Sequence, residues 1–285
     1  MIPILYNDDF SEFNRLVLPL YGKNIIHTVK KFEGVQEFCL KKFEYTNSRD
    51  AIVVFPKELN YEVSDLYLNS LNKYDLVYGF SNDIVDEHYN YNENIILYRT
   101  ALLKSLQKKT EYSFPAFCED SFKNNYVNNI SIGYCGHLFY GRKNIINKFN
   151  LLKYEKNFII RNELLTGTTD IELKNEFIHN IDTNLFTLCY RGAGNYCYRF
   201  YETLMMGRIP ILIDSDRCFI FEKEYDINDI CLVIQKEDEI QNIENKIDNF
   251  ITSKNLKEIQ KNNRYIWEMY CSPIGFLKQF IKNMY

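Results

Sequence analysis

The segment RGAGNYCYRFYETLMMGRIPILID, residues 191–214, places two arginines and a glutamate among glycines and aromatic residues before a wholly apolar run. A core helix followed by a core strand needs none of the charges of Arg191, Arg199 and Glu202. If the preceding LFTLCY, residues 185–190, is a buried strand, Arg191 lies at its carboxyl end, where open α/β sheets bind their ligands. The segment therefore indicates a loop and a helix that hold an anion.

Small and capping residues define the helix predicted here. Gly192 allows the chain to turn tightly, Asn195 is a suitable N-cap for a helix over residues 196–206, and Gly207 ends it. An anion at the start of this helix would meet free backbone N–H groups, the positive end of the helix dipole and Arg199.

Simpler interpretations of the same residues stay open. Arg199 and Glu202 are three residues apart on the predicted helix, so they could form an ordinary surface ion pair of little consequence. The glycines do not fit the G-x-G-x-x-G pattern, so a dinucleotide-binding fingerprint is not supported. The joint placement of the residues favours an anion site more than any one of them does.

Composition limits what the anion can be. The chain has 285 residues, 46% of them hydrophobic and 25% charged, which is typical of a globular protein with more than one ordinary core. Its net charge of −4 gives no support to a nucleic-acid partner or any other large polyanion. A small anion in a local basic pocket fits better.

The sequence also indicates where the protein acts. No apolar span is long enough to cross a membrane, and no secretory signal is visible, so we expect a soluble, cytoplasmic protein without a transmembrane segment. Its eight cysteines are scattered without CxxC or Cys/His ligand spacing, which predicts reduced, mostly buried thiols and no metal site.

Short apolar runs alternate with helix-like stretches along the chain, which predicts the α/β class with parallel sheets. A polar connector after TEYSFPAF favours two Rossmann-like domains, residues 1–125 and residues 126–285, the second ending in a helical tail with a break at Ser272-Pro273. The predicted strands are residues 2–6, 24–28, 51–55 and 75–79 in the first domain, and 130–136, 157–162, 185–190 and 208–214 in the second.

Residues 175–216, NEFIHNIDTNLFTLCYRGAGNYCYRFYETLMMGRIPILIDSD, resemble the donor-binding core of exostosin-family glycosyltransferases. A helix, a strand ending in Arg-Gly, an Arg-Phe-x-Glu helix and a Pro-containing strand follow one another in the family's order. Upstream, IGYCGHLFYGRKNIINKF is similar to the family's glycine-containing strand and arginine-bearing helix start. Downstream, RYIWEMYCSP is similar to its late Trp-Glu segment, so the likeness covers about residues 130–272.

This resemblance implies a GT-B fold, in which two Rossmann-like domains face each other across a cleft. It also implies an inverting glycosyltransferase that uses a nucleotide-sugar, with a UDP-sugar as the expected donor, a glycan hydroxyl as acceptor and no cofactor. By resemblance the arginines neutralise the diphosphate and Glu202 accepts hydrogen bonds from the ribose. The matched positions are Gly136, Arg142, Arg191, Gly192, Arg199 and Glu202; His137, beside Gly136, and Asp214, at a strand end, are further donor-binding candidates.

Three alternatives remain at this stage. A fucosyltransferase-like enzyme with a GDP-sugar is favoured by FIIRNELLTG and opposed by the Arg-Gly pair, and an inactive nucleotide- or sugar-binding module would carry the same motifs. The DSD of residues 214–216 resembles a metal-binding DxD motif. Its position after the arginine-bearing helix argues against that role, so we expect metal-independent activity.

The catalytic base is expected in the first domain, opposite the donor. An inverting transfer needs a carboxylate or imidazole within hydrogen-bond reach of the acceptor hydroxyl. The loop FSNDIVDEHY follows the predicted strand 75–79, and Asp83 is its acid nearest the strand end. Asp83 is therefore the first candidate, ahead of Asp8 and His88; the alternative is that these groups only solvate surface loops.

Overall fold

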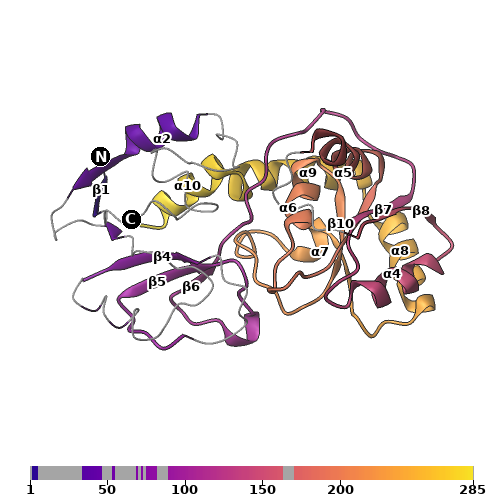
Figure 1. Cartoon of the computed structure of the whole chain (residues 1–285), viewed down its shortest axis with the longest axis horizontal. Coiled ribbons are helices and arrows are strands. Elements are labelled where there is room, and N and C mark those ends of the chain that lie inside the picture. The colour runs from indigo at the N-terminus through magenta and orange to yellow at the C-terminus, as the bar shows by residue number, and fades with distance from the viewer. Residues whose placement is uncertain are drawn as a thin grey trace.

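The computed structural model describes residues 2–5, 34–46, 53–54, 69, 72, 75–81, 89–162 and 170–284, and all structural statements refer to these residues. Two α/β halves lie side by side, with the elements of the N-terminal half on the left of Figure 1 and those of the C-terminal half on the right. The chain crosses from one to the other through an extended segment after residue 113.

Parallel sheets build the N-terminal half. One joins β2 (Phe43–Thr46), β1 (Ile2–Leu5) and β3 (Val53–Val54) in that order, and α2 (Val35–Lys42) leads into β2. The other joins β4 (Val77–Ser81), β5 (Ile95–Arg99) and β6 (Glu111–Ser113). The predicted strands at 2–6, 51–55 and 75–79 overlap β1, β3 and β4, whereas the predicted strand at 24–28 lies outside the described residues.

A five-stranded parallel sheet forms the C-terminal half, in the order β11-β10-β9-β7-β8. From β7 the chain goes outward to the edge strand β8 and then returns to place β9 on the other side of β7. The direction of winding therefore reverses between β7 and β9, and such a switch point opens a crevice beyond the carboxyl ends of the strands. The strands are β7 (Ser131–Gly136), β8 (Glu155–Ile160), β9 (Phe186–Cys189), β10 (Ile209–Ile213) and β11 (Leu232–Ile234).

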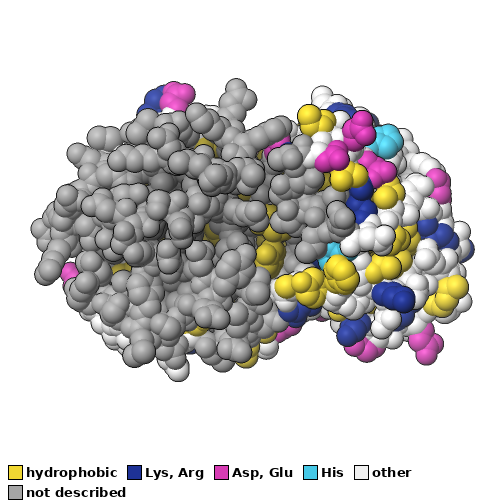
Figure 2. Space-filling view, viewed as in Figure 1, with side chains coloured by type: hydrophobic (Ala, Val, Ile, Leu, Met, Phe, Trp, Pro, Cys, Tyr) yellow, Lys and Arg dark blue, Asp and Glu magenta, His cyan; other side chains and the backbone are white. Residues whose placement is uncertain are grey.

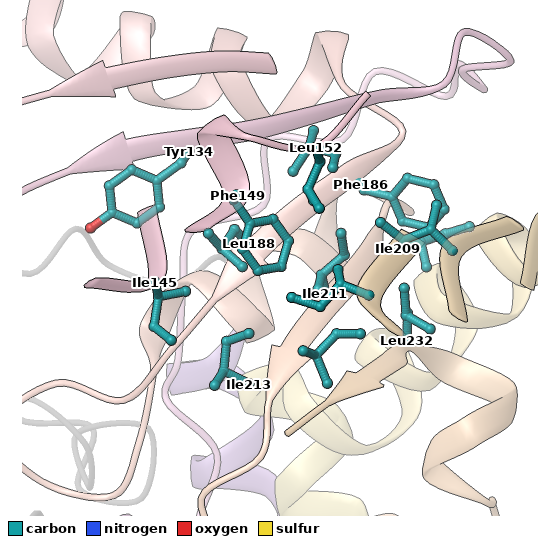
Figure 3. Packing of buried hydrophobic residues seen from close by; sticks show 14 of the residues in the cluster. Tyr134, Ile145, Phe149, Leu152, Phe186, Leu188, Ile209, Ile211, Ile213 and Leu232 are labelled. Atoms are coloured by element: carbon teal, nitrogen blue, oxygen red, sulfur yellow. The ribbon is translucent and has the colours of Figure 1, made fainter. Parts of the chain in front are cut away.

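Helices cover both faces of this sheet, which explains why β9 and β10 are buried along their whole length and read as continuous apolar runs. On one face Phe149 packs with Phe186, Leu188 and Ile211 of the sheet (Figure 3). The helices are α4 (Arg142–Asn150), α5 (Ile171–Thr183), α6 (Tyr198–Met205), α7 (Ile227–Ile230), α8 (Ile240–Ser253) and α9 (Leu256–Ile266). The predicted α/β class with parallel sheets, the architecture from which a GT-B fold is built, is confirmed.

The C-terminal tail is helical and breaks where the sequence predicts. A π-helical turn (Trp267–Cys271) follows α9, and the Ser272 hydroxyl then accepts the N–H of Gly275, 3.0 Å away, to cap α10 (Pro273–Lys282). Phe276 and Phe280 of α10 pack against Tyr98 of β5. Their ring centroids lie 5.7 and 5.6 Å, respectively, from the centroid of the Tyr98 ring. The last helix thus joins the core of the N-terminal half (Figure 1); the boundary near residue 125 stays a prediction.

One detail of the prediction is wrong. The helix after the Arg-Gly pair begins at Tyr198, its N-cap is Cys197, and no side chain caps it, so Asn195 is not the cap. The Gly192 N–H donates to the Tyr196 carbonyl at 2.9 Å, which keeps the chain in a turn through residue 196 and delays the helix. Gly207, with a φ of 61°, ends the helix as expected.

None of the described helices is long and apolar enough to cross a membrane. The cysteines whose burial the structure describes are all buried with free thiols, as the sequence predicts.

Candidate functional site

Two loops at the carboxyl edge of the large sheet carry most of the predicted site residues. The loop from β7 to α4 holds Gly136, His137 and Arg142, and the loop from β9 into α6 holds Gly192 and Arg199. Because β7 and β9 are neighbours on either side of the switch point, the two loops meet. The structure therefore brings together residues that lie 50 or more positions apart in the sequence.

Arg199 lies beneath the loop that follows β7. Its side chain is 8% exposed, its Nη2 donates to the Cys135 carbonyl at 2.5 Å, and its guanidinium lies 4.4 Å from the ring centre of Tyr134. A Cβ on Gly136 would come within 2.7 Å of Nη2, so glycine is needed there for the arginine to approach the strand. The Nε atom of Arg199 is buried and has no hydrogen-bond partner among the residues that the structure describes.

Arg142 and His137 form a buried pair at the start of α4. The Nη1 of Arg142 lies 2.9 Å from the Nε2 of His137, and the Phe139 N–H lies 3.1 Å from its Nδ1. Burial, followed by the charges of Arg142 and Arg199, lowers the pKa of His137 to about 4, so the ring is neutral at pH 7. A neutral imidazole has one acceptor nitrogen, and only one of these donors is bonded at a time.

Arg217 adds a third buried guanidinium that the sequence analysis did not single out. It follows β10, is 3% exposed, and donates from Nη2 to the Tyr201 hydroxyl at 3.0 Å. Its Nε atom, like those of Arg142 and Arg199, is buried and finds no hydrogen-bond partner in the described part of the chain. All three arginines follow strands at the carboxyl edge of the large sheet, namely β7, β9 and β10. We call Arg142, Arg199 and Arg217 the arginine cluster.

The arginine cluster has no carboxylate counter-charge among the residues that the structure describes. No Asp or Glu oxygen in this part of the chain lies within 4.0 Å of a guanidinium nitrogen of the three. A buried charge without an ionic partner is costly, and proteins normally avoid it. The arrangement is what an anion-binding site requires.

Glu202 lies one turn further along α6. The interpretation of Arg199 and Glu202 as a surface ion pair is wrong, because Arg199 is buried and its nitrogens are more than 4.0 Å from the carboxylate. Burial raises the pKa of Glu202 to about 7, although the charge of Arg199 works in the opposite direction. The carboxyl group therefore changes its charge near neutral pH.

Arg191 and Gly192 form the entrance to this loop. The Nη2 of Arg191 donates to the Ala193 carbonyl at 3.2 Å, and its side chain is partly exposed. A Cβ on Gly192 would meet the Nη2 of Arg142 at 3.7 Å, an ordinary contact. Gly192 thus borders the arginine cluster, but neither its φ nor the space around it requires glycine.

Asp214 and Asp216 are engaged in the protein's own structure. Asp214 accepts from Nε2 of Gln235 at 2.9 Å and from the Asp216 N–H at 3.0 Å; these bonds outweigh burial and lower its pKa. Asp216 accepts the Ser105 N–H at 3.0 Å, at the short 3-10 turn Lys104–Leu106. Within the described residues, no group of three or more His, Cys, Asp or Glu side chains could hold a metal ion.

The candidate bases Asp83, Asp8 and His88 lie outside the described residues, so their roles stay predictions. On the face drawn in Figure 2, the described basic side chains are interspersed with acidic and hydrophobic ones.

No model of a known protein family and no curated protein sequence matches the chain. Similar solved structures include HepE of Anabaena in complex with UDP, at 8% identity and a TM-score of 0.48, covering 100% of this chain and 99% of that one. An alpha1,3-fucosyltransferase is 13% identical with a TM-score of 0.38, covering 93% and 81%.

TarM of S. aureus is 9% identical with a TM-score of 0.46, and 84% of this chain aligns with 55% of it. The chain thus spans about half the length of TarM. Identities this low say nothing of activity, so the site is interpreted from this chain's own residues.

Proposed function

We propose that the protein is an exostosin-like glycosyltransferase of the GT-B fold. It transfers a sugar from a nucleoside-diphosphate sugar to a glycan hydroxyl with inversion at the sugar carbon. The observation that carries the proposal is the arginine cluster: three buried guanidinium groups without a carboxylate partner among the described residues, at the carboxyl edge of a parallel sheet.

A diphosphate suits this cluster in charge and in hydrogen bonding. Phosphate oxygens accept charge-assisted bonds from guanidinium groups, which are stronger than bonds between neutral groups. The unpartnered Nε atoms of Arg142 and Arg199 supply donors, and the first N–H groups of α6 supply more. Arg191, at the entrance, adds a fourth positive charge.

The remaining residues have distinct roles in this proposal. Glu202, in its charged form, accepts hydrogen bonds from the ribose hydroxyls, and Gly136 lets Arg199 approach β7. His137 stays neutral and can orient Arg142 without adding a repelling charge. Asp214 borders the donor from the end of β10.

The reaction needs charge stabilisation on the departing nucleoside diphosphate. Fixed positive groups in a water-poor site supply this well, because they need no reorganisation as the negative charge develops. The arginine cluster takes the place of the divalent cation that other glycosyltransferases use, so we propose no metal and no cofactor. UDP is the nucleotide that we propose; HepE, one of the similar structures, was solved with UDP.

The acceptor hydroxyl must lose its proton as the sugar is transferred. Asp83 remains the proposed base, in the loop that follows β4. Asp83→Asn should lower turnover by about 100-fold, which is the lower end of the contribution that a general base makes to rate, and should leave donor binding intact. Near-normal turnover in this variant would exclude Asp83 as the base and make Asp8 the next candidate.

A donor panel tests the proposed activity. Thermal unfolding should shift upward with UDP-sugars more than with GDP-sugars, and product analysis should then find the sugar transferred or hydrolysed. A larger shift with GDP-sugars would favour the fucosyltransferase-like alternative. Stabilisation without any product would indicate a binding module instead of an enzyme.

A further inference from the structure

Two large aromatic side chains lie in solvent on the loop between β7 and α4. Phe139 is 55% exposed and Tyr140 is 51% exposed. Single exposed apolar side chains are common, whereas contiguous ones often mark a binding site. In the part of the chain that the structure describes, no other two of the exposed large hydrophobic residues follow one another in the sequence. We call Phe139 and Tyr140 the aromatic pair.

Hydrogen bonds at both ends hold the loop that carries the aromatic pair. The Tyr134 hydroxyl donates to the His137 carbonyl at 2.5 Å, and the Arg142 N–H donates to the Phe139 carbonyl at 3.2 Å. Between them Tyr140 has a φ of 58°, in the left-handed region that residues other than glycine rarely adopt. Such a conformation persists only where the surrounding structure imposes it, and it is frequent at ligand sites. A loop of defined conformation therefore presents the two rings to solvent.

His137 connects the aromatic pair to the arginine cluster. The centre of its ring lies 5.0 Å from that of Phe139 and 5.9 Å from that of Tyr140. Its Nε2 atom lies 2.9 Å from Nη1 of Arg142. His137 and Arg142 are buried, whereas the two aromatic side chains are more than half exposed. The aromatic pair is thus part of the outer rim of the site whose inner part holds the arginine cluster.

We propose that the aromatic pair binds the acceptor glycan, with a sugar ring packed against the two aromatic rings. This inference rests on the proposed function, which puts the donor diphosphate at the buried arginines and leaves the rim to the second substrate. A pyranose ring has a face of C–H groups that packs against an aromatic ring, and hydroxyl groups around its edge. Lys143 and Asn144, exposed in the first turn of α4, carry side-chain donors for such hydroxyls.

The size of the aromatic pair favours a sugar over a second protein. A stable interface between proteins buries about 800 Å² on each partner, and two half-exposed rings offer only a small part of that. Leu151, the next exposed large hydrophobic residue along the chain, lies beyond the other end of α4. A small apolar platform with polar neighbours matches a saccharide instead.

A printed array of pyranose oligosaccharides, probed with the full chain in the presence of UDP, tests glycan binding without turnover. The unchanged protein should bind a subset of the glycans. The double variant Phe139→Ala/Tyr140→Ala should bind them at least about tenfold more weakly, because covering the exposed half of each ring contributes several-fold to affinity. Tyr140→Phe keeps both rings and should bind as the unchanged protein does. Tyr265→Ala is the matched control, since it removes a ring that is 50% exposed on α9, outside both loops of the site.

Hydroxyl-radical footprinting of the unchanged protein gives a second measurement that needs no variant. A glycan that binds on the array should protect Phe139 and Tyr140 from oxidation and leave Tyr265 as reactive as before. Glycan binding without this protection would place the saccharide elsewhere and overturn the proposal.

Equal glycan signals for the unchanged protein and the double variant would also overturn it, as would an unchanged protein that binds no glycan on the array. If the double variant instead loses affinity for UDP-glucose alone, with binding of UDP and of the glycans unaltered, the rings contact the donor sugar and not the acceptor. Calorimetry with UDP separates this inference from the proposed function. A protein that binds glycans through the aromatic pair but does not bind UDP would contradict the donor site and keep the saccharide site.

Discussion

Buried arginines occur in two contrasting settings in this molecule. Arg208 is fully buried, and its Nη2 lies 2.9 Å from the Asp182 carboxylate, while further bonds reach backbone carbonyls. Arg142, Arg199 and Arg217 are almost as buried, but no described carboxylate pairs with any of them. Arg208 therefore joins α5 to β10, the strand that begins at the next residue. Arg142 and Arg199 lie at the switch point between β7 and β9, and Arg217 follows the neighbouring strand β10.

Breaking the ion pair between Arg208 and Asp182 should have the largest effect, a loss of unfolding free energy. Asp182→Ala leaves a buried guanidinium without its counter-charge, which costs about 3–5 kcal/mol of unfolding free energy. Denaturant unfolding measures this loss. UDP affinity of the folded fraction should stay unchanged, because Asp182 contacts Arg208 and Lys123 and not the arginine cluster.

The pH dependence of donor binding tests whether ionised Glu202 binds the ribose. Since its raised pKa is about 7, the carboxyl is mostly protonated at pH 6 and mostly ionised at pH 8. If the ribose binds the ionised form, affinity for UDP-glucose should rise about tenfold between these values and level off above them, the range over which one such group ionises.

Glu202→Gln should remove this dependence and weaken donor binding at least as much as it lowers turnover at saturating donor. A large loss of kcat with unaltered donor affinity would contradict the ribose role and make Glu202 a catalytic candidate.

Removing an unpaired arginine should cost little stability, in contrast to Asp182→Ala. Arg199→Met keeps most of the side-chain volume and removes a buried charge, so unfolding free energy should change by less than about 1 kcal/mol, about the value of the hydrogen bond lost at Cys135. Loss of several kcal/mol in denaturant unfolding would mean that Arg199 is structural, as Arg208 is.

Removing divalent metal ions with a chelator should have the smallest effect, because activity should not change. Because the arginine cluster supplies the positive charge at the diphosphate, activity should survive EDTA unchanged. Complete loss of activity, restored by Mn²⁺ or Mg²⁺, would mean that a metal ion acts with the cluster and would return Asp214 and Asp216 to consideration as ligands.

Four strands of the large sheet were predictable because each contains a short apolar run bounded by polar or turn residues, whereas its edge strand β11, only three residues long, was missed. The predicted runs at 130–136 and 208–214 coincide with β7 and β10 within two residues. Other strands were missed for physical reasons: β5 lies in a Tyr- and Asn-rich stretch without clear alternation, and β6 is only three residues long. The apolar face of α10 does not reveal which half of the molecule it joins.

The candidate site was predictable where motif and position coincide. Arg142 and Arg199 stand at helix starts after predicted strands, and the fold brings them together. Arg217 could not be recognised, because a lone arginine after a strand carries no pattern, and its burial results from packing against Tyr201 and Phe219. The acid pair of DSD looked like a metal motif, since sequence does not show that the Asp216 carboxylate caps a turn in the other half.

Isothermal calorimetry with UDP tests the central claim most directly, that the arginine cluster binds a nucleoside diphosphate. Arg142→Met, Arg199→Met and Arg217→Met should each weaken binding by about 1.5–3 kcal/mol, the range for a hydrogen bond to a charged group. The matched control is Arg264→Met, which removes an arginine that already has Asp120 and Glu268 as partners and should leave binding unchanged. Unchanged UDP affinity in all three cluster variants would contradict the account and place the donor elsewhere.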